Sequence, residues 1–169
     1  MSAQTTYTQA TPRGVAGGLY DLSAHAINTR INGETGNTLM FGMGVVRGAT
    51  PGSDVKIPAS GAKIDTFEGV VVNGFTTEMD RDGKVTLPPN ASVGVLQYGK
   101  IWVRIKDKDA PVYGDKLYLI INGDDAGLFT KTTSGDTIEV TNGHFIGGKG
   151  TGNVAPVEIF YQKPVGAGA

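Results

Sequence analysis

Glycine and proline interrupt this chain so often that long helices have almost no room to form. An amphipathic helix needs about ten or more residues without a breaker, with apolar side chains spaced by 3.6 residues. The 26 glycines and 8 prolines among the 169 residues cut almost every window before that length is reached. The sequence therefore predicts that helix is a minority element.

One long stretch, from Leu19 to Asn32, carries neither glycine nor proline and can be interpreted in two ways. Helical spacing would place Leu19, Leu22 and Ala26 on one face, whereas strand alternation would group the β-branched residues of its second half. We favour a strand over residues 24–31. The residues that alternate there are Ile27, Thr29 and Ile31.

The remaining chain consists of short runs in which apolar and polar residues alternate, each ended by a turn signal such as Asn73-Gly74 or Tyr98-Gly99. Their spacing is the 8–12 residues typical of β-sandwiches and barrels. We predict an all-β fold, a small β-barrel or jelly-roll-like sandwich of about ten short strands with an extended N-terminal arm. The further predicted strands cover residues 39–45, 55–57, 67–75, 85–87, 93–95, 101–105, 117–121, 127–131, 137–141, 144–146 and 154–161.

The length of the chain fits one domain, and both ends differ in composition from the middle. Residues 1–18 are rich in Thr, Gln and Gly, and residues 163–169 have no apolar pattern. We predict a flexible N-terminal arm at 1–18, a β-domain at 19–162 and a flexible C-terminal tail at 163–169.

Composition excludes several classes of function. The formal net charge of -1 provides no global field that would attract nucleic acid or an anionic membrane. The absence of cysteine excludes disulfides, thiolate zinc sites and thiol catalysis. No apolar run approaches the roughly 18 residues of a membrane span, and the N-terminus lacks the pattern of a secretion signal.

The segment Gly143–Gly150 matches the spacing GxxxxGK of a phosphate-binding loop, but Gly150 stands where Ser or Thr would hold magnesium. The following residues are typical of a loop and a strand rather than the helix that such a site needs. We interpret the segment as a wide glycine loop between the last two strands.

Other candidate sites are similarly incomplete. The residues Glu78, Asp80, Asp82 and Gly83 resemble the start of a calcium loop, but Pro89 replaces its twelfth-position Glu. We interpret them as an exposed acidic hairpin, and the neighbouring acids of the turn Asp124-Asp125 in the same way. We therefore predict no metal site, no cofactor and no catalytic residue.

The two histidines and the single tryptophan each have a functional and a structural interpretation. His25 and His144 lie in no recognisable nucleophile or metal-binding context, so we expect ordinary surface or strand residues. Trp102 could stack on a sugar, but it sits in the strand 101–105 on the face opposite Ile101, Val103 and Ile105. A place in the core or in a subunit contact is favoured.

The order of these predicted strands and turns along the chain resembles that of the structural cement, or decoration, proteins of tailed-bacteriophage capsids. The resemblance covers Gly14 to Ile159 and depends on glycine and hydrophobic patterns rather than on a catalytic signature. The segments that carry it are MFGMGVVRG, VKIP, FEGVVV, VGVLQYGKIWVRI, PVYGDKLYLI, GLFT, GHFIGG and VAPVEIF.

This resemblance implies a non-enzymatic protein that binds the outer surface of the major capsid protein lattice and stabilises the head. It implies a homo-oligomer, a dimer or trimer, located on the virion and made in the host bacterial cytoplasm, with no direct contact to nucleic acid or membrane. A virion-surface carbohydrate-binding or host-adhesion module is the alternative. The N-terminal region would supply capsid or subunit contacts through Tyr7, Pro12, Leu19 and Tyr20.

Overall fold

A computed structural model describes residues 14–36, 38–74 and 85–161, and these form an all-β domain, as predicted. Within them the only helix is a single 3₁₀ turn, η1. No helix in this part of the chain is long and apolar enough to cross a membrane. The elements are β1 (Ala26–Asn32), β2 (Gly44–Arg47), β3 (Asp54–Lys56), η1 (Ile64–Thr66), β4 (Phe67–Val71), β5 (Ser92–Arg104), β6 (Lys116–Ile120), β7 (Phe129–Thr130), β8 (Thr137–Phe145) and β9 (Val154–Ile159).

The first half of the fold is a closed five-stranded barrel. The strands follow the order β1-β3-β2-β4-β5, and β1 closes the barrel by pairing antiparallel with the first part of β5. Only the short β1–β3 contact is parallel. The barrel encloses one of the two apolar clusters, which consists of Leu39, Phe41, Met43, Val45, Val55, Val71, Leu87, Val93 and Val95.

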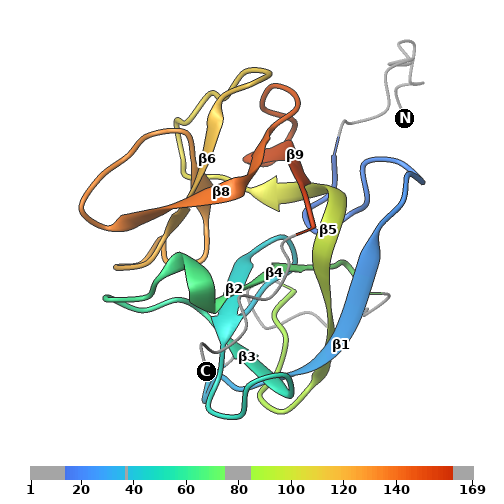
Figure 1. The fold of residues 1–169 in the computed structure, drawn as a ribbon, viewed down its shortest axis with the longest axis vertical. Helices are drawn as coiled ribbons and strands as arrows, with labels where there is room; N and C mark the ends of the chain where they lie inside the picture. Colours follow the sequence, from blue (N-terminus) through green and yellow to red (C-terminus); the bar gives the residue numbers. More distant parts are fainter. Residues whose placement is uncertain (1–13, 37, 75–84, 162–169) are drawn as a thin grey trace, which may run out of the picture.

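The second half is a sheet in the order β5-β9-β8-β6-β7. A parallel bridge between Ile105 and Phe129 joins its last strand back to the end of β5. The sheet wraps the second apolar cluster, in which Phe129 and Phe145 are the largest buried side chains. Figure 1 shows β5 running from the barrel into this second sheet, so that one strand belongs to both halves.

The long strand β5 corrects the turn predicted at Tyr98-Gly99, because the chain passes through this dipeptide without reversing. Gly99 has φ 128° and marks a bend at which the pairing partner of β5 changes from β1 to β9. A Cβ at this position would lie 2.6 Å from the Cβ of His25. The glycine therefore permits a bend and a close contact within a continuous strand.

Three other strand predictions need correction. The run at 85–87 contributes only an isolated bridge between Leu87 and Leu39. The runs at 137–141 and 144–146 are joined into the single strand β8. The predicted strand at 39–45 is regular only from Gly44, because the chain turns at Phe41-Gly42. Gly42 has φ 78° and its N–H donates to the carbonyl of Val71 (2.8 Å), so the chain turns here although Leu39, Phe41, Met43 and Val45 all lie in one apolar cluster.

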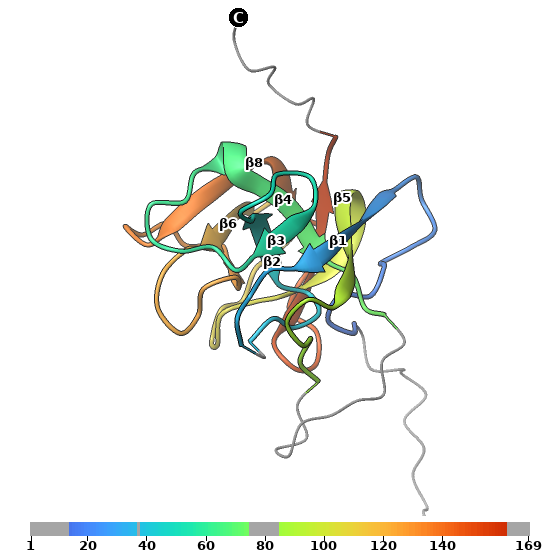
Figure 2. The same ribbon diagram turned by 90° about the horizontal axis from the view of Figure 1, so that it is seen from below.

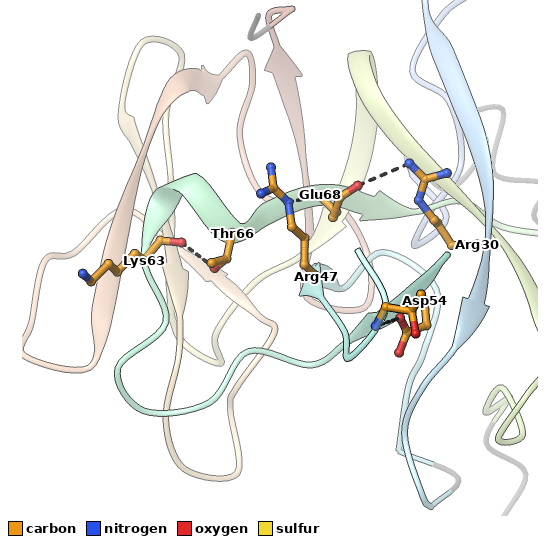
Figure 3. A network of polar contacts seen from close by, with 7 residues as sticks. Arg30, Arg47, Asp54, Lys63, Thr66 and Glu68 are labelled. Atoms are coloured by element: carbon orange, nitrogen blue, oxygen red, sulfur yellow. Dashed lines mark hydrogen bonds and ion pairs between the residues drawn. The ribbon is translucent and has the colours of Figure 1, made fainter. Parts of the chain in front are cut away.

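A partly buried ion-pair network links β1, β2 and β4 through Glu68, as Figure 3 shows. Glu68 is the extra residue of a bulge in β4, since Phe67 pairs with Val46 and Gly69 with Val45. Its carboxylate lies 2.9 Å from Nε of Arg47 and 3.4 Å from Nη2 of Arg30. The Glu68 side chain is only 10% exposed, so the two guanidinium groups compensate the charge that the bulge places inside.

The first described residues lie along the outer side of β5. The N–H of Gly17 donates to the carbonyl of Trp102 (2.7 Å), and the N–H of Trp102 donates to Gly18 (2.9 Å). Leu19 bridges to Ile101 and packs against the second apolar cluster. Residues 17–20 thus pair with β5 ahead of β1, and Figure 2 shows β1 beside β5 from a second direction. Residues 17 and 18, which the sequence analysis assigned to the N-terminal arm, thus pair with β5, and residues 1–13 lie outside the described residues.

Candidate interaction surface

The outer face of β5, β9 and β8 gathers polar and aromatic side chains on one surface. Strand alternation turns Ile101 and Val157 inward, so their neighbours face outward. The register places Lys100 beside Glu158 and Glu158 beside His144, one residue from each of three strands. We call this line of side chains the charged row.

A fixed acid extends the charged row at one end. Nζ of Lys100 lies 3.1 Å from Oδ2 of Asp21. Hydrogen bonds from the hydroxyl and the N–H of Ser23, together with Lys100, lower the pKa of Asp21 to about 2. The hydrogen bond to Asp21, and then the charges of Asp21 and Glu158, raise the pKa of Lys100. Both groups are therefore charged throughout the neutral range.

The other end of the charged row is surrounded by exposed aromatic rings. His144 stacks on Phe160, with ring centres 5.5 Å apart and planes inclined by 22°. Tyr113 meets the same imidazole edge-on at 6.3 Å. Nε2 of His144 lies 3.9 Å from a carboxylate oxygen of Glu158. Tyr161 follows Phe160 in the chain and meets Tyr98 edge-on at 5.9 Å.

These rings are at least half exposed to solvent. The exposed fraction is 76% for Tyr113, 65% for Tyr161 and 50% for Phe160. Aromatic side chains that have one wet and one apolar side are enriched in protein interfaces. We name the surface formed by Tyr113, His144, Glu158 and Phe160 the aromatic face.

The residues predicted to make contacts have different positions. Tyr7 and Pro12 lie outside the described residues. Leu19 is partly buried in the core, whereas Tyr20 is 46% exposed and its ring centre lies 5.7 Å from that of Trp102. The sequence analysis did not identify the aromatic face, because Tyr113 lies in a loop far from His144 and Phe160 in the sequence. The alternation Glu158, Phe160 along β9 was the only local signal.

Trp102 faces outward and forms part of the wall rather than the core. Gly14 lies so close above its ring that a Cβ there would be 2.3 Å from the indole. Tyr20 covers another part of the same ring. The beginning of the described chain and Tyr20 therefore shield Trp102, which leaves the rings at the other end of the charged row as the more accessible aromatic surface.

The other candidate motifs have structural roles in the described chain. Residues 146–153 connect the adjacent antiparallel strands β8 and β9, which confirms the glycine-loop interpretation. Asp124 and Asp125 lie in a turn, where the N–H of Leu128 donates to the carbonyl of Asp125 at 3.0 Å. The acidic segment Glu78–Gly83 lies outside the described residues. Among the residues that are described, no group of three His, Asp or Glu side chains is placed to hold a metal ion.

Comparison with known proteins identifies both a family and a fold. The model of the family described as structural cement protein (E217 gp24/Pam3 gp6) matches residues 3–160. A chain of "The capsid of Myoviridae Phage XM1" is similar in structure, with a TM-score of 0.72 and 21% sequence identity. The match covers 94% of this chain and 97% of that chain, and shows a shared fold. No curated protein sequence matches this chain.

Proposed function

Because this chain belongs to the structural cement protein family of bacteriophages and so has a capsid cement role, we propose that it binds the outer surface of the major capsid protein lattice and stabilises the head. The observation that carries the proposal is the family match, which extends over residues 3–160 and thus over nearly the whole chain. The role of the family is structural, and the chain associates with the capsid of a virion. We further propose that the protein has no enzymatic activity.

The aromatic face supplies a chemically suitable contact with the capsid protein. Its rings offer apolar area that is already exposed, and two of them are held by ring contacts to His144, so little side-chain freedom is lost on binding. The charged row beside it adds groups of both signs, which favour one orientation of the partner. The aromatic face is therefore our proposed capsid contact.

The N-terminal region is a second proposed contact. Tyr7 and Pro12 belong to the segment before Gly14, and the family match includes this segment from residue 3. Leu19 anchors the following residues to the core, and Tyr20 remains accessible next to them. In this proposal the cement protein acts as a homo-oligomer, a dimer or trimer, made in the host cytoplasm and without contact to nucleic acid or membrane.

Stabilisation by such a protein follows from mass action. A ligand that binds the assembled shell, but not separate capsid subunits, lowers the free energy of the assembled state. Several weak contacts held on one lattice reinforce one another, because each bound contact raises the effective concentration for the next. The individual contacts can therefore be modest.

The melting of phage heads with and without the protein tests this function. We expect heads that lack the protein to melt at lower temperature, and added protein to restore the difference. A host-adhesion or carbohydrate-binding module would instead leave melting unchanged and alter only attachment to cells or glycans. Equal melting temperatures would contradict the cement mechanism.

Single substitutions test the proposed contact surface. Phe160→Ala or Tyr113→Ala should weaken binding to heads by roughly tenfold each, the effect of removing a well-buried interface aromatic. Both rings are at least half exposed in the isolated chain, so its folding should be unaffected. Thr133→Ala, in the exposed loop between β7 and β8, is the control. Unchanged binding of both aromatic variants would exclude this face as the contact.

A further inference from the structure

Within the part of the chain that the structure describes, one edge of β1 has no partner strand over half of its length. The N–H of Asn32 donates toward β5, to Ala91, whereas the N–H groups of Ile31 and Gly33 donate to Ser53 and Val55 on the side of β3. Since backbone direction alternates along a strand, the N–H groups of Ile27 and Thr29 also point away from β5. The β1–β3 pairing, however, includes only Ile31 and Asn32 of β1.

The N–H groups of Ile27 and Thr29 consequently have no backbone partner among the residues that the structure describes. The carbonyl of Thr29 accepts only a long hydrogen bond, 3.2 Å, from Nη1 of the adjacent Arg30. In Figure 1 this part of β1 lies at the margin of the molecule. An open strand edge of this kind is a template for an added strand.

The side chains of β1 have the reverse of the usual orientation. Asn28 and Arg30 are paired with Val95 and Val93 of the barrel core, so the polar residues face the interior. The outward side chains are Ile27, Thr29 and Ile31, and the two isoleucines are 40% and 38% exposed. An apolar, β-branched stripe at an open edge is what an added strand would cover.

We propose that this open edge binds, as an added strand, the N-terminal segment (residues 3–13) of a second copy of the chain. The segment has the composition of a strand, since it contains the run Thr5-Thr6-Tyr7-Thr8. It is also included in the family match, which begins at residue 3. This inference rests on the proposed cement function in one respect: binding to a capsid lattice would bring copies of the chain close together.

A neighbouring copy fits the edge better than the chain's own segment does. Gly14 lies against Trp102, and Thr29 is paired with Gly94, eight residues earlier on β5. Eight residues of strand span about 26 Å, whereas 13 extended residues reach roughly 43 to 47 Å. The chain's own segment would spend more than half of its length reaching Thr29, after reversing direction at Gly14. A segment from a second copy has no such cost.

Engineered cysteines can detect this exchange without background, because the chain has no cysteine of its own. One population carries Thr29→Cys, and a second, of different mass, carries Thr5→Cys, Thr6→Cys or Thr8→Cys in turn. Oxidation of the mixture, free and bound to heads, should yield a disulfide between the two populations for at least one pair. Thr141→Cys, which is exposed on β8, replaces Thr29→Cys in the control and should yield none.

Two outcomes would overturn the proposal. One is the absence of any interchain disulfide in both states. The other is a disulfide that forms only within one chain when both cysteines are on it, which would mean that the segment folds back on its own copy. If heads bind the variants normally and no disulfide forms, the strand exchange fails while the cement function stands. If heads are not bound, the result in solution still decides the exchange.

A proline provides an independent test of the backbone contact. Thr29→Pro removes an N–H that points away from β5, so the β1–β5 pairing is retained, as it is when proline occupies an edge strand. We expect it to abolish the disulfide between Ile27→Cys and a cysteine in the segment of the other copy. Thr29→Ala keeps the N–H and should not abolish this disulfide. If Thr29→Pro lowers the melting temperature of the isolated chain, the rate of disulfide formation at Ile27→Cys is compared with the rate at the Thr141→Cys control instead, and equal rates would refute the exchange.

Discussion

At the scale of single residues, the outer surface of the second sheet derives its character from strand alternation. Lys100, Glu158 and His144 lie together because their inward neighbours fill the core. The alternation of the strand at 101–105 was evident in the sequence and correctly placed Trp102 opposite the core. The sequence could not show that the outward residues of three strands form one row, because that depends on register between distant segments.

The ionised carboxylate of Asp21, held first by hydrogen bonds from Ser23 and then by Lys100, makes a testable contribution to acid stability. The pKa of Asp21 is lowered from 3.8 to about 2, so the folded state prefers the ionised form more than the unfolded chain does. The stabilisation is therefore complete above about pH 4 and is lost as the pH falls through about 2. Melting temperatures should fall over this interval by more in the natural chain than in Asp21→Asn.

Asp124→Asn is a control for this experiment, since Asp124 is an exposed aspartate in a turn remote from Lys100 in the sequence. It should leave the acid dependence of the melting temperature unchanged. Identical pH profiles for Asp21→Asn and the natural chain would show that the contacts of the ionised Asp21 with Ser23 and Lys100 contribute nothing to folding.

At the scale of elements, the sequence predicted most strands but not where they join. Alternation correctly indicated a strand at 24–31 and the inward face at 101–105. Breakers were less informative, since a glycine that permits a bend inside a strand has the same local signature as one in a hairpin turn. Gly99 was misinterpreted in this way, because only the contact with His25 and the change of partner strand distinguish the two cases.

Substitution of Gly99 should therefore be costly for two separate reasons. Gly99→Ala introduces strain at a positive φ and a contact of 2.6 Å with the Cβ of His25. We expect a loss of about 2–4 kcal/mol in the free energy of unfolding. Denaturant titration of the isolated domain measures it.

Two matched glycines separate the strain from the contact. Gly152 has φ 79° with open space around it, so Gly152→Ala should cost only the strain, about 1 kcal/mol. Gly135 has open space and no positive φ, and Gly135→Ala should be nearly neutral. If Gly99→Ala costs no more than Gly152→Ala, the close contact at the bend has no energetic importance.

At the scale of the whole molecule, the prediction of a small β-barrel is confirmed, but the way the barrel closes could not be foreseen. Closure needs β1 to pair with β5, which lies about 60 residues later in the chain. It also needs β3 to pair with β1 in parallel, although the other pairings of the barrel are antiparallel. Local patterns contain no information on such pairings. The shared fold with a capsid chain at 21% identity indicates that this closure tolerates extensive change of sequence.

The beginning of the chain gives a prediction at this scale. Deletion of residues 1–13 should leave a domain with an unchanged melting temperature that occupies heads poorly. Deletion of residues 1–20 should in addition lower the melting temperature, because it removes the hydrogen bonds of Gly17 and Gly18 to Trp102 and the packing of Leu19. Scanning calorimetry and occupancy on heads measure the two effects. Normal occupancy after the shorter deletion would exclude the N-terminal segment as a contact.

Because β5 belongs to both halves, the barrel and the second sheet cannot separate from each other without stretching or breaking the pairing of β5. A force that separates the barrel from the second sheet must act along the covalent backbone of β5. It then loads the hydrogen bonds to β1 and β9 together, in shear, rather than opening them one after another as a zipper does. Under the capsid contact proposed above, a deformation of the shell would therefore strain the contacts of this protein with the shell before it strained the protein itself.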